Sequence, residues 1–511
     1  SGSALYGSNA LGGVINVITK KPTSELNFYF KVYGSIYDKP SFSQWEWSKK
    51  MRTYSGLNLN VSKRTGRFSI NALMSKTQSD GYKEQDWYKR LNLFLKIKYD
   101  FSKKLSLLNS STLYLGERGN FFYWEGLQNA LRVNQNSLGQ IVKTQSFNSN
   151  LNLKYLFNIK TDFNFKLSWY YYKFKDNITG PFTESVSNVY QTEEQITHKF
   201  SKNNQVTAGA VFGLNTVKSE LFGNRKSYLF AGYVQDNFRI FRDFKLSLGA
   251  RFDYFKMDTL KSDFKNNSQL NPKFGLIYEL SPSANFRLSF STAFRAPSVS
   301  EIFTTTTASG ITIGPNPNLK PEKSVSYEIG VLHAFSDRFF MDIALFRNEY
   351  KNLIEPVPSG QIYIFDNIAK ASIQGFEASL SSRILKFLSL SAGYTFIETK
   401  ETLPDGSSAE LKYRPKHLLK SNLLASYKNF QFIIDFRFNS KIQKIDRTLM
   451  LQIPNAEETV DVYILDLKAS YSWLYYKFSA GVNNLLRYNY TEFVGNLGPI
   501  RNFYFSVEGS F

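Results

Sequence analysis

The chain has 511 residues, of which 16% are aromatic, and its 63 Lys and Arg against 42 Asp and Glu give a formal net charge of +21. No segment reaches the roughly 18 consecutive apolar residues of a transmembrane helix, and the mean hydropathy is −0.32. The absence of cysteine excludes disulfides, thiolate catalysis and zinc–thiolate sites together. A soluble chain of this length would contain several domains with helices and linkers, and neither is evident.

The N-terminal segment combines small residues with a short apolar run. Residues 1–22 read SGSALYGSNALGGVINVITKKP. Gly12 and Gly13 permit close approach of the backbone to a neighbouring segment. The run that follows predicts a short buried strand formed by Val14, Ile15, Val17 and Ile18.

Beyond residue 26 the chain repeats one pattern, in which apolar and polar residues alternate. In the segment 163–171 the apolar face carries Phe163, Phe165, Leu167, Trp169 and Tyr171. The segments 57–62, 91–100 and 245–254 alternate in the same way. Alternation with period 2 predicts β-strands with one apolar and one polar face.

The connections between these strands alternate between short turns and long polar loops. Short turns are expected near residues 64–66, 101–104, 202–204, 241–243, 281–284, 336–337 and 427–430. Long loops are expected at 38–50, 116–143, 176–189, 215–226, 294–320, 352–370, 397–412, 440–460 and 485–498. Short periplasmic turns and long extracellular loops are typical of an outer-membrane barrel. The count from residue 26 onward is about 22 strands, the size class of plugged outer-membrane transporters.

The last strand ends on an aromatic carboxyl terminus. One face carries Phe503, Phe505, Val507, Gly509 and Phe511, and the other carries Asn502, Tyr504, Ser506, Glu508 and Ser510. A barrel strand needs such faces, because lipid contacts one and the lumen contacts the other. The last strand of a soluble sandwich is the alternative for this segment alone.

Further short motifs lie within the strand region. They are Phe294-Arg295-Ala296-Pro297 followed by Ser300-Glu301-Ile302-Phe303, the segment from Asn316 to Ser324, the segment from Asn367 to Ala378, and Val482-Asn483-Asn484-Leu485. Together with residues 1–22 they resemble segments of TonB-dependent outer-membrane receptors. The residues that carry the resemblance are Tyr6, Gly7, Gly12, Gly13, Asn16, Phe294, Arg295, Pro297, Asn316, Pro317, Leu319, Pro321, Glu322 and Phe511.

The resemblance implies an all-β fold, a transmembrane antiparallel β-barrel of about 22 strands with a remnant of the N-terminal plug domain. Residues 1–25 would be the C-terminal end of the plug and residues 26–511 the barrel. In that family the plug fills the barrel, ligand binds extracellular loops and plug apices, and the TonB complex pulls on an N-terminal box. The signal peptide, that box and most of the plug are not in the sequence, which is interpreted as an N-terminally truncated piece.

The resemblance also narrows the range of ligands that we expect. Haem receptors of the family carry a histidine between the motifs at 294 and 316, whereas residues 298–315 contain none, and structural roles are expected for His198, His333 and His417. The early acidic residues Asp38, Asp80 and Asp86 are too dispersed for the six or more oxygens of a calcium site, which weakens a calcium-dependent cobalamin mode.

A ferric siderophore is therefore the expected ligand, and early loops offer aromatic and basic side chains for it. The candidate ligand-binding residues are Trp45, Trp47, Arg118, Phe121, Phe122, Tyr123 and Trp124. Such residues provide stacking and cation–π contacts. The alternative role for these aromatics is packing within the loops or in the interfacial girdle.

The function predicted is high-affinity, TonB-dependent uptake of a scarce metal chelate by a receptor in the outer membrane of a Gram-negative bacterium. A cobalamin or other nutrient receptor and a passive porin are the alternatives, and the motif at residues 4–20 argues against a porin. No catalytic motif is present, so no enzyme, cofactor or resident metal is expected, and an outer-membrane protease or lipase is disfavoured.

The expected partners are outer-membrane lipid and lipopolysaccharide, the TonB complex through the missing segment, the metal chelate, and the barrel-assembly machinery, which in the family reads a terminal aromatic such as Phe511. Nucleic acid is not expected, because the lysines recur singly within strands and turns, as at Lys96, Lys154 and Lys245.

Overall fold

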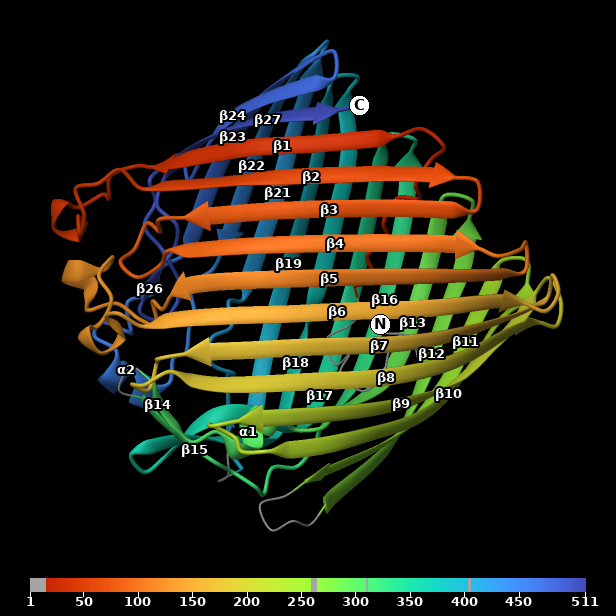
Figure 1. Ribbon diagram of the computed structural model, residues 1–511, viewed down its shortest axis with the longest axis horizontal. Helices are drawn as coiled ribbons and strands as arrows, with labels where there is room; N and C mark the ends of the chain where they lie inside the picture. The colour runs from red at the N-terminus through yellow and green to blue at the C-terminus, as the bar shows by residue number, and fades with distance from the viewer. Residues whose placement is uncertain (1–14, 259–263, 309–310, 403–405) are drawn as a thin grey trace.

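In the computed structural model, which describes residues 15–258, 264–308, 311–402 and 406–511, the chain forms a closed antiparallel barrel of 22 strands (Figure 1). The barrel strands are β1 (Asn27–Tyr37), β2 (Thr53–Thr65), β3 (Phe68–Ser79), β4 (Tyr88–Asp100), β5 (Leu105–Gly119), β6 (Ile141–Leu156), β7 (Thr161–Asp176), β8 (Thr183–Lys199), β9 (Asn204–Ser219), β10 (Arg225–Phe241), β11 (Phe244–Asp258), β12 (Phe264–Ser281), β13 (Ala284–Arg295), β16 (Glu322–Ser336), β17 (Phe339–Ser359), β18 (Ile362–Leu385), β19 (Leu388–Thr402), β21 (His417–Tyr427), β22 (Phe430–Asn439), β23 (Val462–Trp473), β24 (Tyr476–Asn483) and β27 (Asn502–Ser510). The strand number and the alternation of faces predicted from the sequence are confirmed.

The barrel closes where the first strand meets the last. β1 pairs with β2 on one side and with β27 on the other, in a register that places Val32 opposite Val507. The backbone N–H of Phe511 donates to the carbonyl of Phe28 and the N–H of Phe28 donates back, both at 2.9 Å. Every barrel strand thus has a neighbour on both edges, which removes the unpaired backbone that an open sheet would expose.

Long connections and tight turns lie at opposite ends of the barrel, which we call the loop end and the turn end (Figure 1, left and right). The loop end carries short elements: η2 (Ser43–Trp45), η3 (Leu127–Asn129), η4 (Gln135–Ser137), α1 (Val299–Phe303), β14 (Thr306–Ala308), β15 (Ile311–Gly314), β20 (Ser408–Ala409), α2 (Arg447–Gln452), β25 (Thr491–Phe493) and β26 (Asn496–Leu497). Among the described residues, no helix is long and apolar enough to cross a membrane.

The two faces of the wall differ in chemistry as the sequence pattern predicts. On β27, Phe503 and Phe505 are 45% and 55% exposed on the outer face, whereas Ser506 on the inner face is 1% exposed. Inner-face side chains pair across strands, as Lys31 Nζ does with Glu508 Oε1 at 2.8 Å. An apolar outer face suits lipid, and a polar, hydrogen-bonded inner face suits a lumen.

Several connections are shorter than the sequence predicts. The expected loop at 352–370 is a hairpin in which β17 and β18 stay paired up to Ser359 and Ile362. β8 begins at Thr183, β9 continues to Ser219, and β19 continues to Thr402. At β8, β9 and β19 the paired strand ends are mainly polar and so resemble loops in the sequence, whereas the 352–370 hairpin contains Pro356, Pro358 and Gly360, which are typical of turns.

The buried strand predicted at residues 14–18 is wrong for the part that the structure describes. Ile15, Val17 and Ile18 belong to no strand and are 93%, 81% and 85% exposed. The described residues offer this segment no partner strand, and an unpaired strand cannot satisfy its backbone. Val14 and the motif residues Tyr6, Gly7, Gly12 and Gly13 lie outside the described residues.

Phe505→Lys puts a charge on the lipid-facing wall and is expected to reduce the free energy of unfolding by about 2–4 kcal/mol. The control is Ser391→Lys, at an exposed position on the inner face, which should cost much less. Ser506→Lys, the mild change expected from alternation alone, is unsuitable because Ser506 is buried. Urea titration of the barrels refolded in lipid vesicles measures both costs, and equal losses would contradict the assignment of faces.

Candidate functional site

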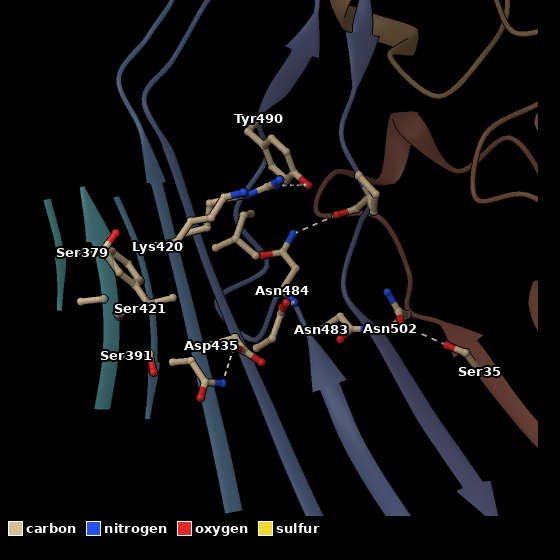
Figure 2. Close-up of a pocket in the computed structure, with 18 of the residues that line it drawn as sticks. Ser35, Ser379, Ser391, Lys420, Ser421, Asp435, Asn483, Asn484, Tyr490 and Asn502 are labelled. Atoms are coloured by element: carbon tan, nitrogen blue, oxygen red, sulfur yellow. Dashed lines mark hydrogen bonds between the residues drawn. The ribbon is translucent and has the colours of Figure 1, made fainter. Parts of the chain in front are cut away.

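A cavity of about 820 Å³ opens in the inner wall below the loop end, between strands far apart in the sequence (Figure 2). Its lining comes from β1, β2, β4, β18, β19, β21 to β24, the connection before β27 and the first residue of β27, so it includes the closure of the barrel. We call it the mouth cavity. Two basic residues, Lys420 and Arg437, and two acidic residues, Asp435 and Asp466, line it.

Hydrogen bonds fix most of the polar wall of the mouth cavity. Asn422 Nδ2 donates to Asp435 Oδ1 at 2.7 Å, and the backbone N–H of Asn484 donates to Asp466 Oδ1 at 2.7 Å. Arg437 Nη2 donates to the hydroxyl of Tyr490 at 3.3 Å (Figure 2) and pairs with Glu492 at 3.0 Å. Lys420, in contrast, is exposed and has no ion pair among the described residues, which leaves its ammonium group available to a ligand.

Tyrosines provide the aromatic part of this wall. Tyr37, Tyr54 and Tyr88 line the cavity beside Tyr490. The rings of Tyr54 and Tyr88 lie 6.4 Å apart edge to face, and the guanidinium of Arg90 lies 4.1 Å from the ring centre of Tyr88. Such an array provides ring faces and phenol groups to a ligand that is aromatic and polar at once.

Asn484 fixes the loop that closes the cavity. It adopts a left-handed backbone conformation with φ of 51°. Its side-chain nitrogen donates to the carbonyls of Tyr488 at 2.9 Å and Pro499 at 3.1 Å, and its oxygen accepts from the N–H of Tyr488. The sequence motif at 482–485 thus marks a strand end whose asparagine organises the following loop.

Above the cavity the loops share one apolar cluster, which we call the loop core. Its buried members are Trp45, Tyr123, Trp124, Ala130, Leu131, Ile311, Tyr363, Ile453, Ala456, Leu497 and Ile500. The indole N–H of Trp45 donates to the carbonyl of Leu127 at 2.8 Å, and that of Trp124 donates to the carbonyl of Pro454 at 2.7 Å. Loops from six places in the chain therefore fold as one unit.

The structure separates the candidate ligand-binding residues into two groups. Trp45, Tyr123 and Trp124 are buried in the loop core, and Trp47 and Phe121 pack against it. Phe122 is 45% exposed, and Arg118 is also exposed, with its Nη1 donating to the carbonyl of Gly119 at 3.2 Å. Only Phe122 and Arg118 thus lie outside the packed cluster.

A buried lysine inside this loop layer was not singled out from the sequence. Lys83 is 5% exposed, its Nζ donates to Asn496 Oδ1 at 2.6 Å and lies 4.5 Å from the ring centre of Phe121. Burial lowers the pKa of Lys83 and raises the pKa of Asp86, 3.9 Å away. The aromatic residue next to it, Tyr82, was the only signal in the sequence, and it is a weak one.

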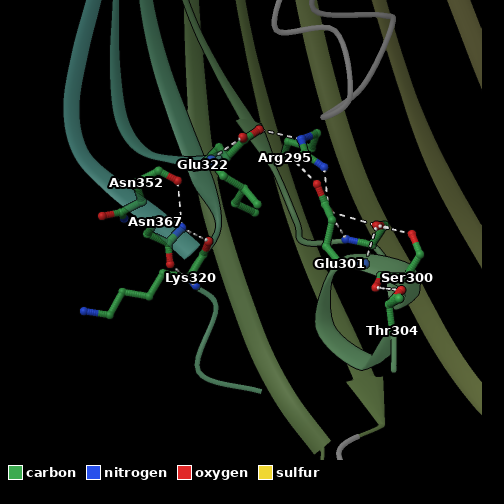
Figure 3. Close-up of polar contacts among 10 residues, drawn as sticks. Arg295, Ser300, Glu301, Thr304, Lys320, Glu322, Asn352 and Asn367 are labelled. Atoms are coloured by element: carbon green, nitrogen blue, oxygen red, sulfur yellow. Dashed lines mark hydrogen bonds and ion pairs between the residues drawn. The ribbon is translucent and has the colours of Figure 1, made fainter. Parts of the chain in front are cut away.

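The motif residues around Arg295 form an ion-pair cluster that holds the loop between β13 and β16 (Figure 3). Arg295 donates through Nη1 and Nη2 to both carboxylate oxygens of Glu301, each at 2.9 Å, and through Nε to Glu322. Glu322 in turn accepts from the backbone N–H of Ile354 at 2.7 Å. Ser298 and Glu301 form a capping box at the start of α1.

Asparagines of the same motifs tie this loop to the β17–β18 hairpin. Asn316 Nδ2 donates to the carbonyl of Phe365 at 2.9 Å, and Asn367 Nδ2 donates to the carbonyls of Lys320 at 3.0 Å and Asn352 at 2.8 Å (Figure 3 shows the second pair). Phe294 and Leu319 are each 1% exposed. Pro297 is buried, Pro321 half-buried, and Pro317 and Asn16 exposed.

The histidines and early aspartates make local contacts. His198 Nδ1 bonds the Thr161 hydroxyl and His417 Nδ1 the Tyr394 hydroxyl, both at 2.8 Å, and the ring of His333 packs 4.2 Å from Phe335. Asp38 pairs with Arg501 at 2.6 Å, and Asp80 accepts from Thr53. In the described part of the chain, no group of three His, Cys, Asp or Glu is placed to hold a metal ion.

The pKa of Glu301 predicts how the loop at residues 296–321, between β13 and β16, responds to acid. Burial opposes ionisation of Glu301, but the hydrogen bonds from Arg295 and Ser298 outweigh it and hold the pKa below its usual 4.5. The folded-state pKa is thus below the unfolded value, so the stabilisation is complete above about pH 4.5 and is lost as the pH falls through the lower folded value. Limited proteolysis should show the 296–321 loop becoming cleavable in that acid range.

Glu301→Gln is the matched variant for this prediction. It keeps the shape and the capping position but removes the charge, so loop cleavage should be higher at neutral pH and should vary less between neutral and acid pH. An unchanged pH profile in this variant would contradict a role for Glu301 ionisation.

Comparison with known proteins agrees with this geometry. Residues 33–485 match the family model described as TonB dependent receptor-like, beta-barrel. The iron-regulated outer membrane virulence protein of Vibrio cholerae is 26% identical over 212 residues, covering 38% of this chain and 31% of that protein. The vitamin B12 transporter BtuB of Vibrio vulnificus is 24% identical over 469 residues, covering 86% of this chain and 67% of that protein. The chain spans about a third of the length of the first of these relatives.

Solved structures share the fold over almost the whole chain. The unliganded ferric citrate transporter FecA superposes with a TM-score of 0.81 at 15% identity, covering 99% of this chain and 82% of that one. The siderophore receptor PirA of Pseudomonas aeruginosa gives 0.76 at 20% identity, covering 100% and 85%. Proteins with this barrel reside in the outer membrane and act as transporters, not enzymes. The match to the family model spans most of the chain, which therefore belongs to the TonB-dependent receptor family.

Proposed function

We propose that this chain is the barrel of a receptor that takes up a ferric siderophore across the outer membrane with energy supplied through TonB. The observation that carries this proposal is the mouth cavity, where an arginine, four tyrosines and a lysine that forms no ion pair within the described part of the chain lie beneath a prefolded loop layer. Ring faces and cations suit a chelate with aromatic and anionic oxygen ligands. The names of several relatives and structural neighbours, such as the catecholate siderophore receptor Fiu, support the same class.

A cobalamin receptor is the second candidate, because the BtuB relative covers 86% of this chain. The aspartates Asp38 and Asp80 are already engaged by Arg501 and Thr53, which argues against a calcium-supported mode. A passive porin does not account for the motif at residues 4–20.

The domain division is part of the proposal. Residues 1–25 are the end of a plug and residues 26–511 are the barrel. Residues 15–26 carry no strand, and Thr19 Oγ1 accepts a hydrogen bond at 2.7 Å from Lys96 Nζ on the inner wall. Such a contact suits a segment that belongs inside the lumen. The TonB complex would act on a preceding segment.

Within the site, we assign ligand contact to Lys420, Arg437 and Tyr490 in the mouth cavity and to Phe122 and Arg118 among the early loop residues. Trp45, Trp47, Phe121, Tyr123 and Trp124 act instead by holding the loops in place. No cofactor or resident metal takes part, since iron arrives within the ligand.

The remaining partners follow from the outer surface. Exposed outer-wall aromatics and aliphatics contact lipid and lipopolysaccharide, and the terminal Phe511 is read by the barrel-assembly machinery. We propose no nucleic-acid partner, because the lysines recur singly within strands and turns.

Growth on single iron sources tests the function. A receptor-deficient strain carrying the full-length parent gene should grow on one or more ferric siderophores under iron limitation and should stop when the TonB system is deleted. Uptake that persists without TonB would indicate a porin. Growth supported only in a parallel assay, in which a cobalamin-dependent strain is limited for cobalamin, would indicate the second candidate.

Phe122→Ala and Trp124→Phe separate ligand contact from loop packing. Phe122→Ala should weaken chelate binding by about 1 kcal/mol, the size of a stacking or cation–π contact, with little change in stability. Trp124→Phe removes the hydrogen bond to Pro454 and should destabilise the loop layer. Chelate titration and thermal unfolding measure both effects, and a Phe122→Ala variant with unchanged affinity would contradict the assignment.

Lys420→Ala tests the unpaired cation of the cavity. It should weaken the binding of an anionic chelate and leave thermal stability unchanged, because Lys420 has no ion pair to lose among the described residues. Loss of stability without loss of affinity would instead show a structural role.

A further inference from the structure

A groove of about 730 Å³ lies on the outer, lipid-facing wall of the barrel, across strands β7 to β12 in the lower part of Figure 1. A smaller hollow of about 370 Å³ adjoins it and shares part of its lining. We call the two together the outer groove. Its floor includes Ala208, Ala210, Gly232 and Ala250, and its sides include Phe163, Ile196, Phe212, Phe230, Val234, Phe252 and Leu270. Because it faces lipid, its shape does not depend on what fills the lumen.

The strand register places the small residues of the floor side by side. Ala210 on β9 lies opposite Glu194 on β8 and opposite Gly232 on β10, and Gly232 lies opposite Phe252 on β11. A methyl group in place of the Gly232 hydrogen would meet no heavy atom within 4 Å beyond its chain neighbours. Small residues let two proteins approach closely within a membrane. The outer groove therefore has room for side chains of a neighbouring protein.

One acidic residue, Glu194, lines this apolar surface. Its neighbour Glu193 faces the lumen, where it pairs with Lys166 at 3.0 Å and accepts from the hydroxyl of Tyr233 at 2.7 Å. Glu194 points the other way and is exposed, and within the described residues its carboxyl has no ion pair and no hydrogen-bond partner. Ionisable groups on a lipid-facing wall are costly, and they mark sites of interaction.

Aromatic residues on either side of Glu194 show how deep it lies. Tyr190, four residues earlier, is 43% exposed and stacks on Trp169 with ring centres 6.4 Å apart. Phe200, six residues later, is 63% exposed and packs against His198. Ten strand residues of about 3.4 Å each, tilted by about 40°, span about 26 Å, close to the height of the apolar band of a barrel. Glu194 therefore lies near the middle of the membrane, out of reach of water and headgroups.

We propose that the outer groove is the contact through which two copies of this chain pair side by side in the membrane. Copies inserted in the same direction are related by a two-fold axis along the membrane normal, so each residue meets partners at its own depth. At the depth of Glu194, the carboxyl that a second copy brings is that of its own Glu194. The inference does not depend on which solute the receptor carries.

Hydrogen bonding explains why a second copy fits this groove better than lipid does. A carboxyl in hydrocarbon is least costly in its neutral form, in which it both donates and accepts. Two neutral carboxyls that face each other therefore satisfy one another, whereas acyl chains offer neither donor nor acceptor at this depth. The rings of Phe212 and Phe230, with centres 5.1 Å apart, form a ridge beside the small residues. A ridge next to a groove on one surface suits an isologous contact, in which each copy fills the groove of the other.

Cross-linking tests the pairing, and the chain has no cysteine of its own to interfere. The 511-residue chain with Ala210→Cys is refolded into lipid vesicles from one side and treated with a short thiol cross-linker. The control is Ile434→Cys, a lipid-facing position on β22, far around the barrel from β9. A heat-modifiable gel shift confirms that each barrel is folded. At a low ratio of protein to lipid, Ala210→Cys should give about ten times more cross-linked dimer than the control.

Variants of Glu194 made together with Ala210→Cys separate hydrogen bonding from packing. Glu194→Gln keeps a donor and an acceptor and should change the dimer yield by less than about twofold, whereas Glu194→Leu should lower it about tenfold. Gly232→Leu fills the groove and should lower it as much. A yield from Ala210→Cys no greater than that of the control would show that lipid fills the groove and would overturn the proposal. Equal yields from Glu194→Gln and Glu194→Leu would also overturn it.

A second measurement uses the full-length parent protein in the outer membrane of cells, with a photo-reactive residue in place of Ala210. The main product should have twice the mass of the parent protein and contain no other chain. A product that contains a different protein would show another occupant and would overturn the pairing. Neither measurement involves uptake, so both can fail while the proposed function stands.

Discussion

The whole structure depends on one constraint, which is that every backbone N–H and C=O group within the hydrocarbon core of the membrane needs a hydrogen-bond partner. No water is present there to satisfy an open strand edge, so a sheet that crosses a membrane must close. The chain meets this constraint by pairing β1 with β27 at the ends of a barrel that spans nearly its whole length. Phe28, Phe30, Tyr475 and Tyr476 surround Phe511 at this seam, with ring centres 5.5 to 6.4 Å from it.

Closure has a consequence for the loops. Strands distant in the sequence become neighbours, so their connections converge over one mouth. There they pack into the loop core, while the cluster of Arg295, Glu301 and Glu322 fastens the loop before β16 to the wall. The mouth cavity is therefore bounded by groups that are already positioned, which reduces the ordering cost of binding.

The barrel could be predicted from the sequence because lipid imposes a period of 2 on every strand. Strand ends above the membrane could not, since the polar end of β19, from Glu398 to Thr402, stays paired with β18. For the candidate site, the sequence predicted the kinds of side chain but not which of them face a ligand. Trp124 and Phe122 come from the same aromatic run, yet one is 1% exposed and the other 45%, because burial depends on loops from elsewhere in the chain. Lys420 and Arg437 lie on strands and carry no local signal that separates them from other lumen cations.

We propose that the mouth cavity receives the chelate. The most direct measurement is a cryo-electron microscopy map of the full-length parent protein bound to a ferric chelate. The chelate should be one that supports growth of the strain carrying the parent gene. Iron-bearing density should lie beside Lys420, Arg437 and Tyr490, beneath the loop core. Density bound only on the outer surface of the loops, away from this wall, would contradict it.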